Sequence, residues 1–411
     1  MGEILFLSHR IPFPPDRGDK IRSHHVLKRL ARIAPVHVAT FADDERDFIH
    51  EGDLAAVTRS HILVQRTKSV PIAGLQALAR GLPLSLTAFD HPDLAAFVRD
   101  MLWLHPIETI FVFSGQMGQY IPSDFAGRVI TDFVDVDSAK FEAYGAKHRG
   151  FRSWMEKREA RLLRQEEARI ARRSHVSLLI SQAEAELFRT RLPDAVRRTA
   201  AVRALGNGID SDYFDPADIE PEPRMFAGGS PRLVFTGQMD YAPNIAAVNR
   251  VIRHILPQVR HVLPDASFHI VGRSPPSAVM AHHGRDGVHV WGRVDDVRPW
   301  IAGADVAIVP LDIARGVQNK VLEAMAMARP VVLSLEAATG IAARHGREFA
   351  VAETDEDLAK AVIAICHDRE AARAMGRAAR AWVVENAGWD AALADLPEII
   401  GAMALRQTYA A

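Results

Sequence analysis

The segment most suggestive of chemistry is residues 315–330, R-G-V-Q-N-K-V-L-E-A-M-A-M-A-R-P. A helix that begins near Gln318 would place Lys320 in its first turn, at the positive end of the helix dipole, with Glu323 three residues further along the same face. Lys320, Arg315 and free helix N–H groups could stabilise a phosphate, while Glu323 could accept hydrogen bonds from hydroxyl groups. An amphipathic helix with an ordinary Lys–Glu pair has the same spacing, so the segment by itself leaves both interpretations open.

A glycine turn is expected in residues 236–244, T-G-Q-M-D-Y-A-P-N, where an apolar strand gives way to a helix. Gly237 would allow a ligand to approach the backbone, and the start of the helix would again offer N–H groups to a phosphate. A tight turn without a ligand is an equally good interpretation.

The third candidate is the loop at residues 12–22, P-F-P-P-D-R-G-D-K-I-R, between the first expected strand and the first expected helix. Gly18 permits close approach, and Lys20 and Arg22 add positive charge beside helix N–H groups that could bind a phosphate or an acceptor molecule. The loop lacks G-x-G-x-x-G, so it is not a dinucleotide-binding fingerprint. A proline-rich connector that leads into a charged helix is the alternative.

Carboxylates gather in residues 132–138, D-F-V-D-V-D-S, which close another expected strand. Asp135 and Asp137 form a D-x-D pattern whose oxygens suit a divalent cation, but the pattern is frequent by chance, and stabilisation by Lys320 needs no metal. We therefore expect no metal ion here. A carboxylate at this strand end would instead orient an acceptor or assist its deprotonation.

The remaining residues do not favour other metal or nucleophile chemistry. The pairs His24–His25 and His282–His283 are adjacent in sequence, and neighbouring residues of a helix point about 100° apart, unlike the i, i+4 pair that a metal requires. The single cysteine, Cys366, excludes an internal disulfide and a cysteine-based metal site.

Residues 147–173 hold ten Lys and Arg against four Glu, with Phe151, Trp154 and Met155 near their start. This pattern is typical of a basic amphipathic helix that can rest on an anionic bilayer. A solvated helix that crosses the domain surface, with Glu–Arg pairs on its exposed face, is the other interpretation and is slightly favoured.

Composition narrows the class of protein. The chain has 411 residues, 48% of them apolar, with 50 basic and 51 acidic side chains. This is typical of a globular protein with two or three domains and excludes a disordered or nucleic-acid-coating chain. The first apolar run has only four residues, and no run approaches the roughly 18 of a membrane span. A cytoplasmic protein is expected, at most peripheral on the inner face of the plasma membrane.

Short apolar runs alternate with amphipathic stretches, which predicts repeated βαβ units and an α/β fold. We expect two Rossmann-like domains with parallel sheets, at 1–205 and 232–385, joined by a Gly-, Pro- and acid-rich linker at 206–231. A C-terminal helix at 386–411 would cross back to the first domain. The expected strands are 3–8, 36–41, 61–65, 109–114, 129–134, 176–180, 232–236, 267–271, 288–291, 306–310 and 330–334, and the main helices are 19–33, 244–262 and 318–328.

The elements also indicate where a ligand would bind. In open parallel sheets, ligands bind beyond the carboxyl ends of the strands. Two facing domains would therefore place the site in the cleft between them.

Three motifs together resemble a known family: S-H-R-I-P-F-P-P-D-R-G-D-K-I-R near the N-terminus, N-G-I-D-S-D-Y-F at 207–214, and N-K-V-L-E-A-M-A-M-A-R-P-V-V at 319–332. The chain resembles the family-4 retaining glycosyltransferases, and more narrowly the sugar transferases associated with exosortase-linked exopolysaccharide clusters. The resemblance covers nearly the whole chain. It implies the two-domain GT-B fold, with a nucleotide-sugar donor on the C-terminal domain, an acceptor on the N-terminal domain, and retaining transfer without a metal or other cofactor.

The resemblance also implies roles for particular residues. Glu323 matches the second glutamate of the family's E-x7-E motif, which contacts the donor ribose, and residues 291–294 match the stretch that meets the base. The sequence departs from the family where the first glutamate is replaced by Arg315, and where Gln238 and Met239 stand in place of basic residues. The expected catalytic residues are Asp135, Lys320 and Glu323; the donor-binding residues are Gly237, Gln238, Asn244, Arg273, Arg293, Val294, Arg315, Gly316, Asn319, Lys320 and Glu323; the acceptor-binding residues are Asp16, Gly18, Asp19, Lys20, Arg22, Asp132 and Asp137.

The expected function is transfer of a sugar from a nucleotide-sugar to a glycan or lipid-linked acceptor in exopolysaccharide biosynthesis, with no nucleic-acid partner. Two alternatives are a non-catalytic nucleotide-sugar-binding subunit of an assembly complex, which the missing first glutamate suggests, and a nucleotide-sugar epimerase on the same fold.

Overall fold

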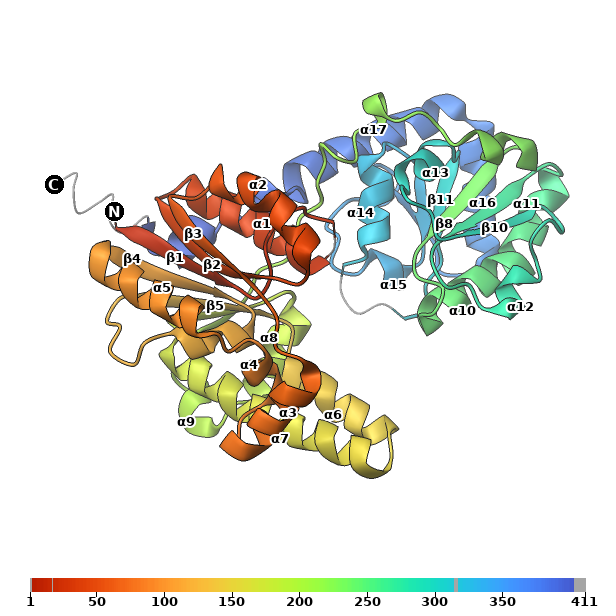
Figure 1. Ribbon diagram of the computed structural model, residues 1–411. Helices are drawn as coiled ribbons and strands as arrows, with labels where there is room; N and C mark the ends of the chain where they lie inside the picture. Colours follow the sequence, from red (N-terminus) through yellow and green to blue (C-terminus); the bar gives the residue numbers. More distant parts are fainter. Residues whose placement is uncertain (1, 17, 314–316, 403–411) are drawn as a thin grey trace. The chain divides into compact units, whose positions relative to one another are not determined.

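The computed structural model describes residues 2–16, 18–313 and 317–402 of the chain (Figure 1). The chain forms two compact units. The N-terminal unit comprises the chain up to Asn207 together with the described residues from Ala392 onward, and the C-terminal unit comprises Gly208–Ala391.

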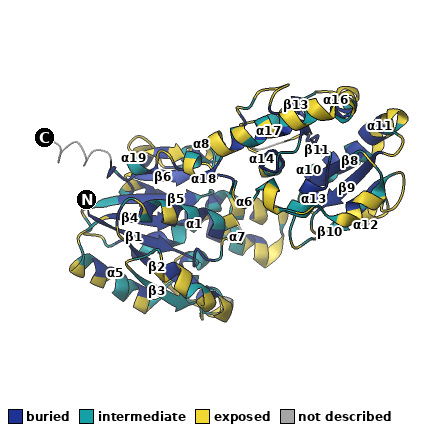
Figure 2. Cartoon of the chain, turned by 90° about the horizontal axis from the view of Figure 1, so that it is seen from above, coloured by how far each residue is buried: buried dark blue, intermediate teal, exposed yellow. Residues whose placement is uncertain are grey.

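The N-terminal unit is built on a parallel sheet that has seven strands among the described residues, in the order β3-β2-β1-β4-β5-β6-β7. Every residue of β1 and β2 is buried, because parallel strands in this class of fold are covered on both faces. Figure 2 shows most strands of the sheets as buried elements. The strands are β1 (Glu3–Ser8), β2 (Val36–Ala42), β3 (Ser60–Gln65), β4 (Ile107–Phe113), β5 (Arg128–Val134), β6 (Val176–Leu179) and β7 (Val202–Ala204).

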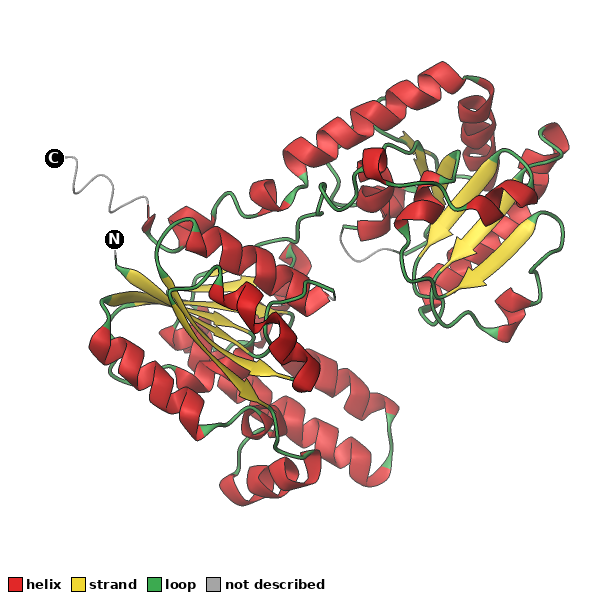
Figure 3. Ribbon diagram, turned by 45° about the horizontal axis from the view of Figure 1, so that its top comes forward, coloured by secondary structure: helices red, strands yellow, loops and turns green. Residues whose placement is uncertain are grey.

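Helices flank this sheet and connect successive strands (Figure 3). They are α1 (Gly18–Ala31), α2 (Glu51–Ala55), α3 (Val70–Arg80), α4 (Leu84–Ala88), α5 (Pro92–Leu104), α6 (Asp137–Lys147), α7 (Gly150–Arg173), α8 (Gln182–Arg191), α9 (Asp194–Arg197) and α19 (Leu396–Ile399), with 3-10 turns η1 (Glu45–His50) and η2 (Gly115–Tyr120).

The C-terminal unit has a second parallel sheet, with six strands among the described residues, in the order β10-β9-β8-β11-β12-β13. The strands are β8 (Arg232–Thr236), β9 (Ser267–Val271), β10 (Val288–Gly292), β11 (Val306–Val309), β12 (Val331–Leu333) and β13 (Ala350–Val351). The helices are α10 (Ala242–Arg250), α11 (Leu256–Val262), α12 (Ser277–Met280), α13 (Arg298–Ala302), α14 (Asn319–Ala326), α15 (Leu335–Ala338), α16 (Asp355–His367), α17 (Arg369–Asn386) and α18 (Trp389–Ala392), with 3-10 turns η3 (Pro216–Asp218) and η4 (Pro223–Gly228).

The predicted α/β class with two parallel sheets is confirmed. The expected strands 3–8, 232–236 and 267–271 match β1, β8 and β9 residue for residue. The short strands β7 and β13 were not predicted, because two or three residues carry too little periodicity to be recognised.

The helix expected at 244–262 begins two residues earlier and contains a π-helical segment, Val251–Ile255 (η5). The physical reason is Pro257 in the first turn of α11. Proline has no N–H and its ring collides with the carbonyl group four residues before it, so the helix widens locally at that point.

Residues 208–231, expected to lie within the linker, pack on the C-terminal unit. Met225 is completely buried in its core, and the Ile209 backbone forms a bridge with Gly388. The Arg380 guanidinium on α17 donates to the carbonyl oxygens of Ser211 and Phe214 at 3.4 and 2.9 Å. The segment is therefore held by specific contacts.

None of the helices in the described part of the chain combines the length and the apolar composition that crossing a membrane requires.

A buried ion pair joins α1 to the centre of the N-terminal sheet. Arg22 Nε donates to Asp132 Oδ2 at 2.8 Å, and both side chains are almost completely inaccessible. Arg22 Nη1 also donates to the carbonyl oxygen of Gly206 and to Asn207 Oδ1, at 3.1 and 2.9 Å. The pair thus connects three segments that are distant in sequence.

Substitution of Arg22 by alanine is expected to lower the free energy of unfolding of the N-terminal unit by about 3–5 kcal/mol, because it leaves the Asp132 carboxylate buried without its cation. Hydrogen exchange of β1 and β5 peptides, followed by mass spectrometry across a urea series, measures this change. Arg197→Ala, which removes an exposed ion pair with Asp194, is the control and should change the free energy by less than about 1 kcal/mol. Equal effects of the two substitutions would contradict the prediction.

Candidate functional site

The C-terminal sheet reverses its strand order between β8 and β11. β8 leads through Gly237 to α10, and β11 leads toward α14. In open α/β sheets, the ligand crevice lies beyond the carboxyl ends of the strands at this switch point. The two segments that the sequence predicts to bind a ligand in this domain, residues 236–244 and 315–330, therefore follow the two strands that flank the switch point.

The structure brings Gly237, Asn244 and Lys320 together. Lys320 Nζ donates to Asn244 Oδ1 at 2.6 Å, and Asn244 Nδ2 donates to the carbonyl oxygen of Gln238 at 2.8 Å. Gly237 has φ 153°, and a Cβ atom there would lie 2.9 Å from both Lys320 Nζ and Asn244 Nδ2. A side chain at position 237 would therefore displace the Lys320 ammonium group from the turn, which is why glycine is required there.

Lys320 lies in the first turn of α14, as predicted from the sequence. Its side chain is half-buried, with Nζ 4.3 Å from the centre of the Phe235 ring. Burial lowers the pKa of Lys320 to about 8, against the opposing effect of the Glu323 carboxylate. At neutral pH the group is a partly desolvated cation, whose charge acts more strongly on a nearby anion than an exposed charge would.

Glu323 follows one turn later on α14, and its side chain is half-buried. Burial raises its pKa to about 7, while the Lys320 ammonium opposes this change. The carboxylate has no hydrogen bond or ion pair with any residue that the structure describes. Its oxygens can therefore accept hydrogen bonds from the hydroxyl groups of a ligand.

A second glycine that the sequence analysis did not identify is essential to this turn. Gly272, at the end of β9, has φ 156°, and a Cβ atom on it would lie 1.6 Å from the carbonyl oxygen of Gly237. The Met239 N–H donates to the carbonyl oxygen of Arg273 at 2.9 Å, which ties the two strand ends together. The requirement for Gly272 comes from a residue 35 positions earlier, so local sequence gives no signal of it.

Five other predicted donor-binding residues are described by the structure, and one of them, Val294, packs against the hydrophobic core. Gln238, Arg273, Arg293 and Asn319 are exposed, and Val294 is half-buried. Arg315 and Gly316 lie outside the described residues.

In the N-terminal unit, the loop after β1 contains the exposed residues Asp16 and Gly18, and Gly18 is the first residue of α1. No atom lies within 4 Å of the position that a Gly18 Cβ would take, so the backbone there is open to approach. Asp19 accepts hydrogen bonds from the Arg10 guanidinium and lies 3.3 Å from His9 Nε2. Although burial opposes it, these partners lower the pKa of Asp19.

Lys20 and Arg22, predicted to present charge to a ligand, are turned into the N-terminal unit. Lys20 Nζ donates to Asp47 Oδ1 at 2.7 Å and to the Phe13 carbonyl oxygen at 3.3 Å. Arg22 pairs with Asp132, whose pKa is raised by burial against the effect of that arginine. In this structure the three side chains fix the loop and the strand end from inside, since each is less than 5% exposed.

The predicted carboxylates Asp135 and Asp137 lie just after β5 and are half-buried. Both pair with one cation, Lys140 Nζ, at 2.8 and 3.3 Å. Val134 before them has φ 69°, and Ser114, at the end of the neighbouring strand β4, has φ 77°. Left-handed backbone at residues other than glycine is costly and concentrates at functional sites, which marks this edge of the sheet as a candidate site.

His9, at the carboxyl end of β1, is a candidate that the sequence analysis missed. Its ring stacks on Phe113 at the end of β4, with centres 6.0 Å apart, and meets Phe89 edge-on at 5.9 Å. Its Nδ1 atom is buried and has no hydrogen-bond partner within the described ranges. The feature of the sequence that could have identified His9 is its position directly after the first predicted strand.

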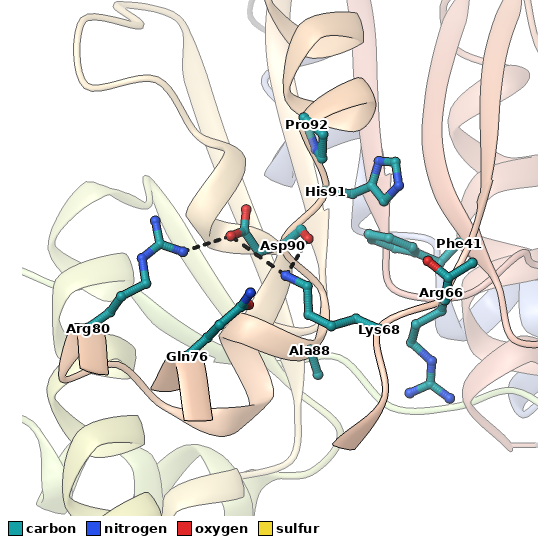
Figure 4. Close-up of a pocket in the computed structure, with 10 residues that line it drawn as sticks. Phe41, Arg66, Lys68, Gln76, Arg80, Ala88, Asp90, His91 and Pro92 are labelled. Atoms are coloured by element: carbon teal, nitrogen blue, oxygen red, sulfur yellow. Dashed lines mark hydrogen bonds and ion pairs between the residues drawn. The ribbon is translucent and has the colours of Figure 1, made fainter. Parts of the chain in front are cut away.

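A pocket of about 540 Å³ opens near the carboxyl ends of β2 and β3 (Figure 4). Lys68 Nζ donates there to the carbonyl oxygens of Thr87 and Asp90 at 3.0 and 2.9 Å, and Arg80 pairs with the Asp90 carboxylate at 2.9 Å. The sequence did not predict this pocket, because four separate segments form it. Its lining is Phe41, Arg66, Thr67, Lys68, Gln76, Arg80, Ala88, Asp90, His91 and Pro92.

Comparison with known families places the candidate site of the C-terminal unit in a recognised domain. Residues 230–368 match the model of the family described as glycosyl transferases group 1. Gly237, Lys320 and Glu323 all lie within the matched range. The candidate site therefore lies in the part of the chain that is similar to this family.

Solved structures show the same fold over the whole chain. The Anabaena protein Alr3699/HepE in complex with UDP matches with 14% identity and a TM-score of 0.61, covering 97% of this chain and 100% of that one. Sucrose-phosphate synthase from Thermosynechococcus elongatus matches with 16% identity and a TM-score of 0.60, covering 100% of both chains. WaaG, a glycosyltransferase involved in lipopolysaccharide biosynthesis, matches with 17% identity and a TM-score of 0.53, covering 97% of this chain and 100% of that one. The predicted GT-B fold is confirmed.

Among proteins with curated descriptions, none matches the sequence at a significant level.

The lowered pKa of Lys320 predicts unusual chemical reactivity. An amine-reactive acetylating reagent should modify Lys320 with a midpoint near pH 8, because its amine loses its proton well below the range of an ordinary lysine. Competitive labelling followed by peptide mass spectrometry measures the midpoint. Lys360, an exposed residue whose pKa is raised by its pair with Glu356, is the internal control and should still be protonated at that pH. Coincident midpoints for the two lysines would show that burial does not lower the Lys320 pKa.

Proposed function

We propose that this chain is an enzyme that transfers a sugar from a nucleoside-diphosphate sugar to a glycan or lipid-linked acceptor, retaining the anomeric configuration and using no metal ion in the transfer. The single observation that carries the proposal is the group of Gly237, Asn244, Lys320 and Glu323 at the switch point of a group 1 glycosyltransferase domain. More specifically, we propose that the enzyme acts in the cytoplasm, in the assembly of a bacterial exopolysaccharide.

The chemistry of the donor explains why these residues would suffice. When the bond between the sugar and the diphosphate breaks, negative charge grows on the departing phosphate. The Lys320 ammonium and the free N–H groups at the start of α14 can stabilise that charge. Glu323, which lies on the same helix and has unoccupied acceptor oxygens, suits the ribose hydroxyl groups.

The proposed base is uracil, on the support of the Anabaena structure, whose own ligand is UDP. Gly237 would let the diphosphate approach the backbone, while the exposed Arg273 and Arg293 could add positive charge. Arg315, at the place of the family's first glutamate, would then contact the phosphate or the donor sugar.

The acceptor is proposed to bind at the carboxyl edge of the N-terminal sheet. This edge contains the open backbone at Gly18, the strained residues Ser114 and Val134, and the pocket that Lys68 lines. Asp135 is the proposed residue for orienting or deprotonating the acceptor hydroxyl group. Lys20, Arg22 and Asp132 would act by holding the loop in place.

Kinetics with UDP-glucose, UDP-galactose and other nucleotide-sugars, with lipid-linked acceptors, test the proposal. Lys320→Ala is expected to lower kcat about 100- to 1000-fold, because it removes the cation that stabilises the leaving group. Glu323→Gln is expected to lower kcat/KM about 10- to 100-fold. Lys360→Ala, which removes an exposed cation of α16, is the matched control and should leave the rate unchanged.

The wild-type enzyme should show a bell-shaped pH profile of kcat/KM. The rate should rise as Glu323 loses its proton near pH 7 and fall as Lys320 loses its proton near pH 8. Glu323→Gln should lose the acidic limb alone. Nucleotide release that is equal in Lys320→Ala and wild type would refute the proposed role of Lys320 in the transfer.

Two other functions give different outcomes in the same assay. A non-catalytic subunit would bind the nucleotide-sugar and release no nucleotide with any acceptor. An epimerase would convert the donor when no acceptor is present.

Peripheral attachment to an anionic bilayer is proposed through a surface that includes only the start of the helix at 147–173. One face of α7 is buried against the unit, with Leu163 and Ile170 inside, so the whole helix does not lie open to a membrane. Phe151 and Trp154 near its start are exposed and stack at 5.7 Å. Arg158, one turn beyond Trp154, joins this surface to α3.

The α3 helix extends the exposed apolar surface. Ile72, Leu75 and Leu78 are 45–72% exposed. Arg158 on α7 donates to the carbonyl oxygens of Ala77 and Leu82 at 2.9 and 3.3 Å, so the end of α3 lies beside α7, as Figure 1 also shows. Apolar side chains with Arg and Lys at their margins are typical of surfaces that rest on anionic lipid.

Sedimentation with liposomes tests this surface. Leu75→Glu and Trp154→Glu are each expected to reduce the fraction bound to vesicles that contain anionic lipid, because a charge would have to enter the bilayer interface. Trp103→Glu changes a more exposed tryptophan, on α5, and serves as the control. Binding that does not depend on anionic lipid, or that the control weakens equally, would exclude this surface.

A further inference from the structure

Three potential metal ligands meet at the amino ends of the strands in the N-terminal sheet, at the edge opposite the loops described above. Glu3 is the first residue of β1, and His37 is the second residue of the neighbouring strand β2. His105 follows α5 and lies two residues before β4. The pairing of β1 with both β2 and β4 brings the three residues to one place.

The donor atoms of these residues converge. Glu3 Oε2 lies 2.7 Å from His37 Nε2 and 3.1 Å from His105 Nδ1, and all three donor atoms lie within 4.8 Å of one another. Glu3 and His37 are buried, whereas the His105 side chain is 24% exposed. A buried set of ligands with one member at the surface has an entry path for an ion.

The hydrogen bonds around His37 determine which of its nitrogens can bind a ligand. The Ser60 hydroxyl group lies 3.3 Å from Met101 Sδ and 2.7 Å from His37 Nδ1, and when it donates to the sulfur its oxygen accepts from the Nδ1–H group. In the neutral ring, Nε2 then turns an unprotonated lone pair toward the Glu3 carboxylate. In this tautomer two lone pairs would repel each other at 2.7 Å, and a cation between them makes the contact favourable.

The other oxygen of Glu3 is already occupied. Glu3 Oε1 accepts a hydrogen bond from the Arg59 guanidinium, which leaves Oε2 for the histidines. Ser60 on the imidazole and Arg59 on the carboxylate are the kind of outer partners that orient metal ligands in proteins.

We propose that Glu3, His37 and His105 form a binding site for a divalent transition-metal ion, with zinc as the best match and water as the fourth ligand. Two imidazole nitrogens and one carboxylate oxygen suit zinc, which binds such atoms at about 2.0–2.2 Å in tetrahedral geometry. That geometry separates the ligand atoms by about 3.3 Å, so the side chains would open by a few tenths of an ångström. His105, at the surface, has room to move.

The ion would join β1, β2 and the segment between α5 and β4. Its place at the amino edge of the sheet separates it from the residues proposed for sugar transfer, and the transfer chemistry proposed above does not require it. The expected effect is on the stability of the N-terminal unit, because an ion that binds only the folded state stabilises it.

The test uses the untagged full-length protein after chelator treatment and dialysis, titrated with zinc chloride in competition with a chromogenic chelator. Wild type should bind one zinc ion per chain and show a higher Tm with zinc. His105→Ala and Glu3→Gln should each weaken zinc binding by at least about tenfold and lose the rise in Tm. Circular dichroism confirms that both variants are folded.

His61→Ala is the matched control, because His61 forms a pair with Glu51 at 3.1 Å without a second histidine. Its zinc affinity and Tm response should equal those of wild type. Two results would overturn the proposal: wild-type protein that takes up no stoichiometric zinc, which would leave a proton as the cation between Glu3 and His37, and equal zinc binding by His105→Ala and His61→Ala.

Discussion

Partial burial of the Lys320 ammonium group is the constraint on which the C-terminal unit depends. The group lies where β8 and β11 diverge, with a neutral amide as its hydrogen-bond acceptor, an aromatic ring beside it and the Glu323 carboxylate one helical turn away. Burial disfavours both charged groups, so each gains stability from a ligand that supplies the missing interaction. The two glycines at the ends of β8 and β9 keep that space free of side chains. A ligand that carries an anion beside hydroxyl groups would interact with the Lys320 ammonium group and the Glu323 carboxylate at the same time.

The N-terminal unit uses its charges differently. Lys20 and Arg22, which precede most of α1, are held by Asp47 and Asp132 inside the unit, and Asp19 is held by His9 and Arg10. These contacts tie the loop after β1 to β5 and to the turn after β2, so the edge of the sheet is shaped by buried ion pairs. Breaking such a pair costs far more than removing an exposed one, so Lys20 and Arg22 hold the start of α1 firmly to the unit. The open backbone at Gly18 and the pocket near Lys68 lie at this edge, together with the strained residues at the ends of β4 and β5.

Local sequence was sufficient for the strands other than β7 and β13, and for the first turn of α14. The apolar run at 232–236 and the spacing of Lys320 and Glu323 are properties of neighbouring residues, and the structure reproduces both. Gly272 and the burial of Lys20 were beyond such reasoning, because their causes are the Gly237 carbonyl oxygen and the Asp47 carboxylate, which lie 35 and 27 residues away along the chain. The cluster of Glu3, His37 and His105 was missed for the same reason, since these residues are far apart in sequence and meet only through strand pairing.

The division of the chain has a consequence for how the protein is made. The N-terminal unit takes its last helix, α19, from residues that are translated after the whole C-terminal unit, and Arg128 at the start of β5 donates to the Ile399 carbonyl oxygen at 2.9 Å. On the ribosome, the first half of the chain would therefore emerge without one of its own packing partners. It would wait, incompletely covered, while nearly two hundred further residues are synthesised. Emergence of α19, and not completion of the first sheet, would be the event that lets this half reach its native state.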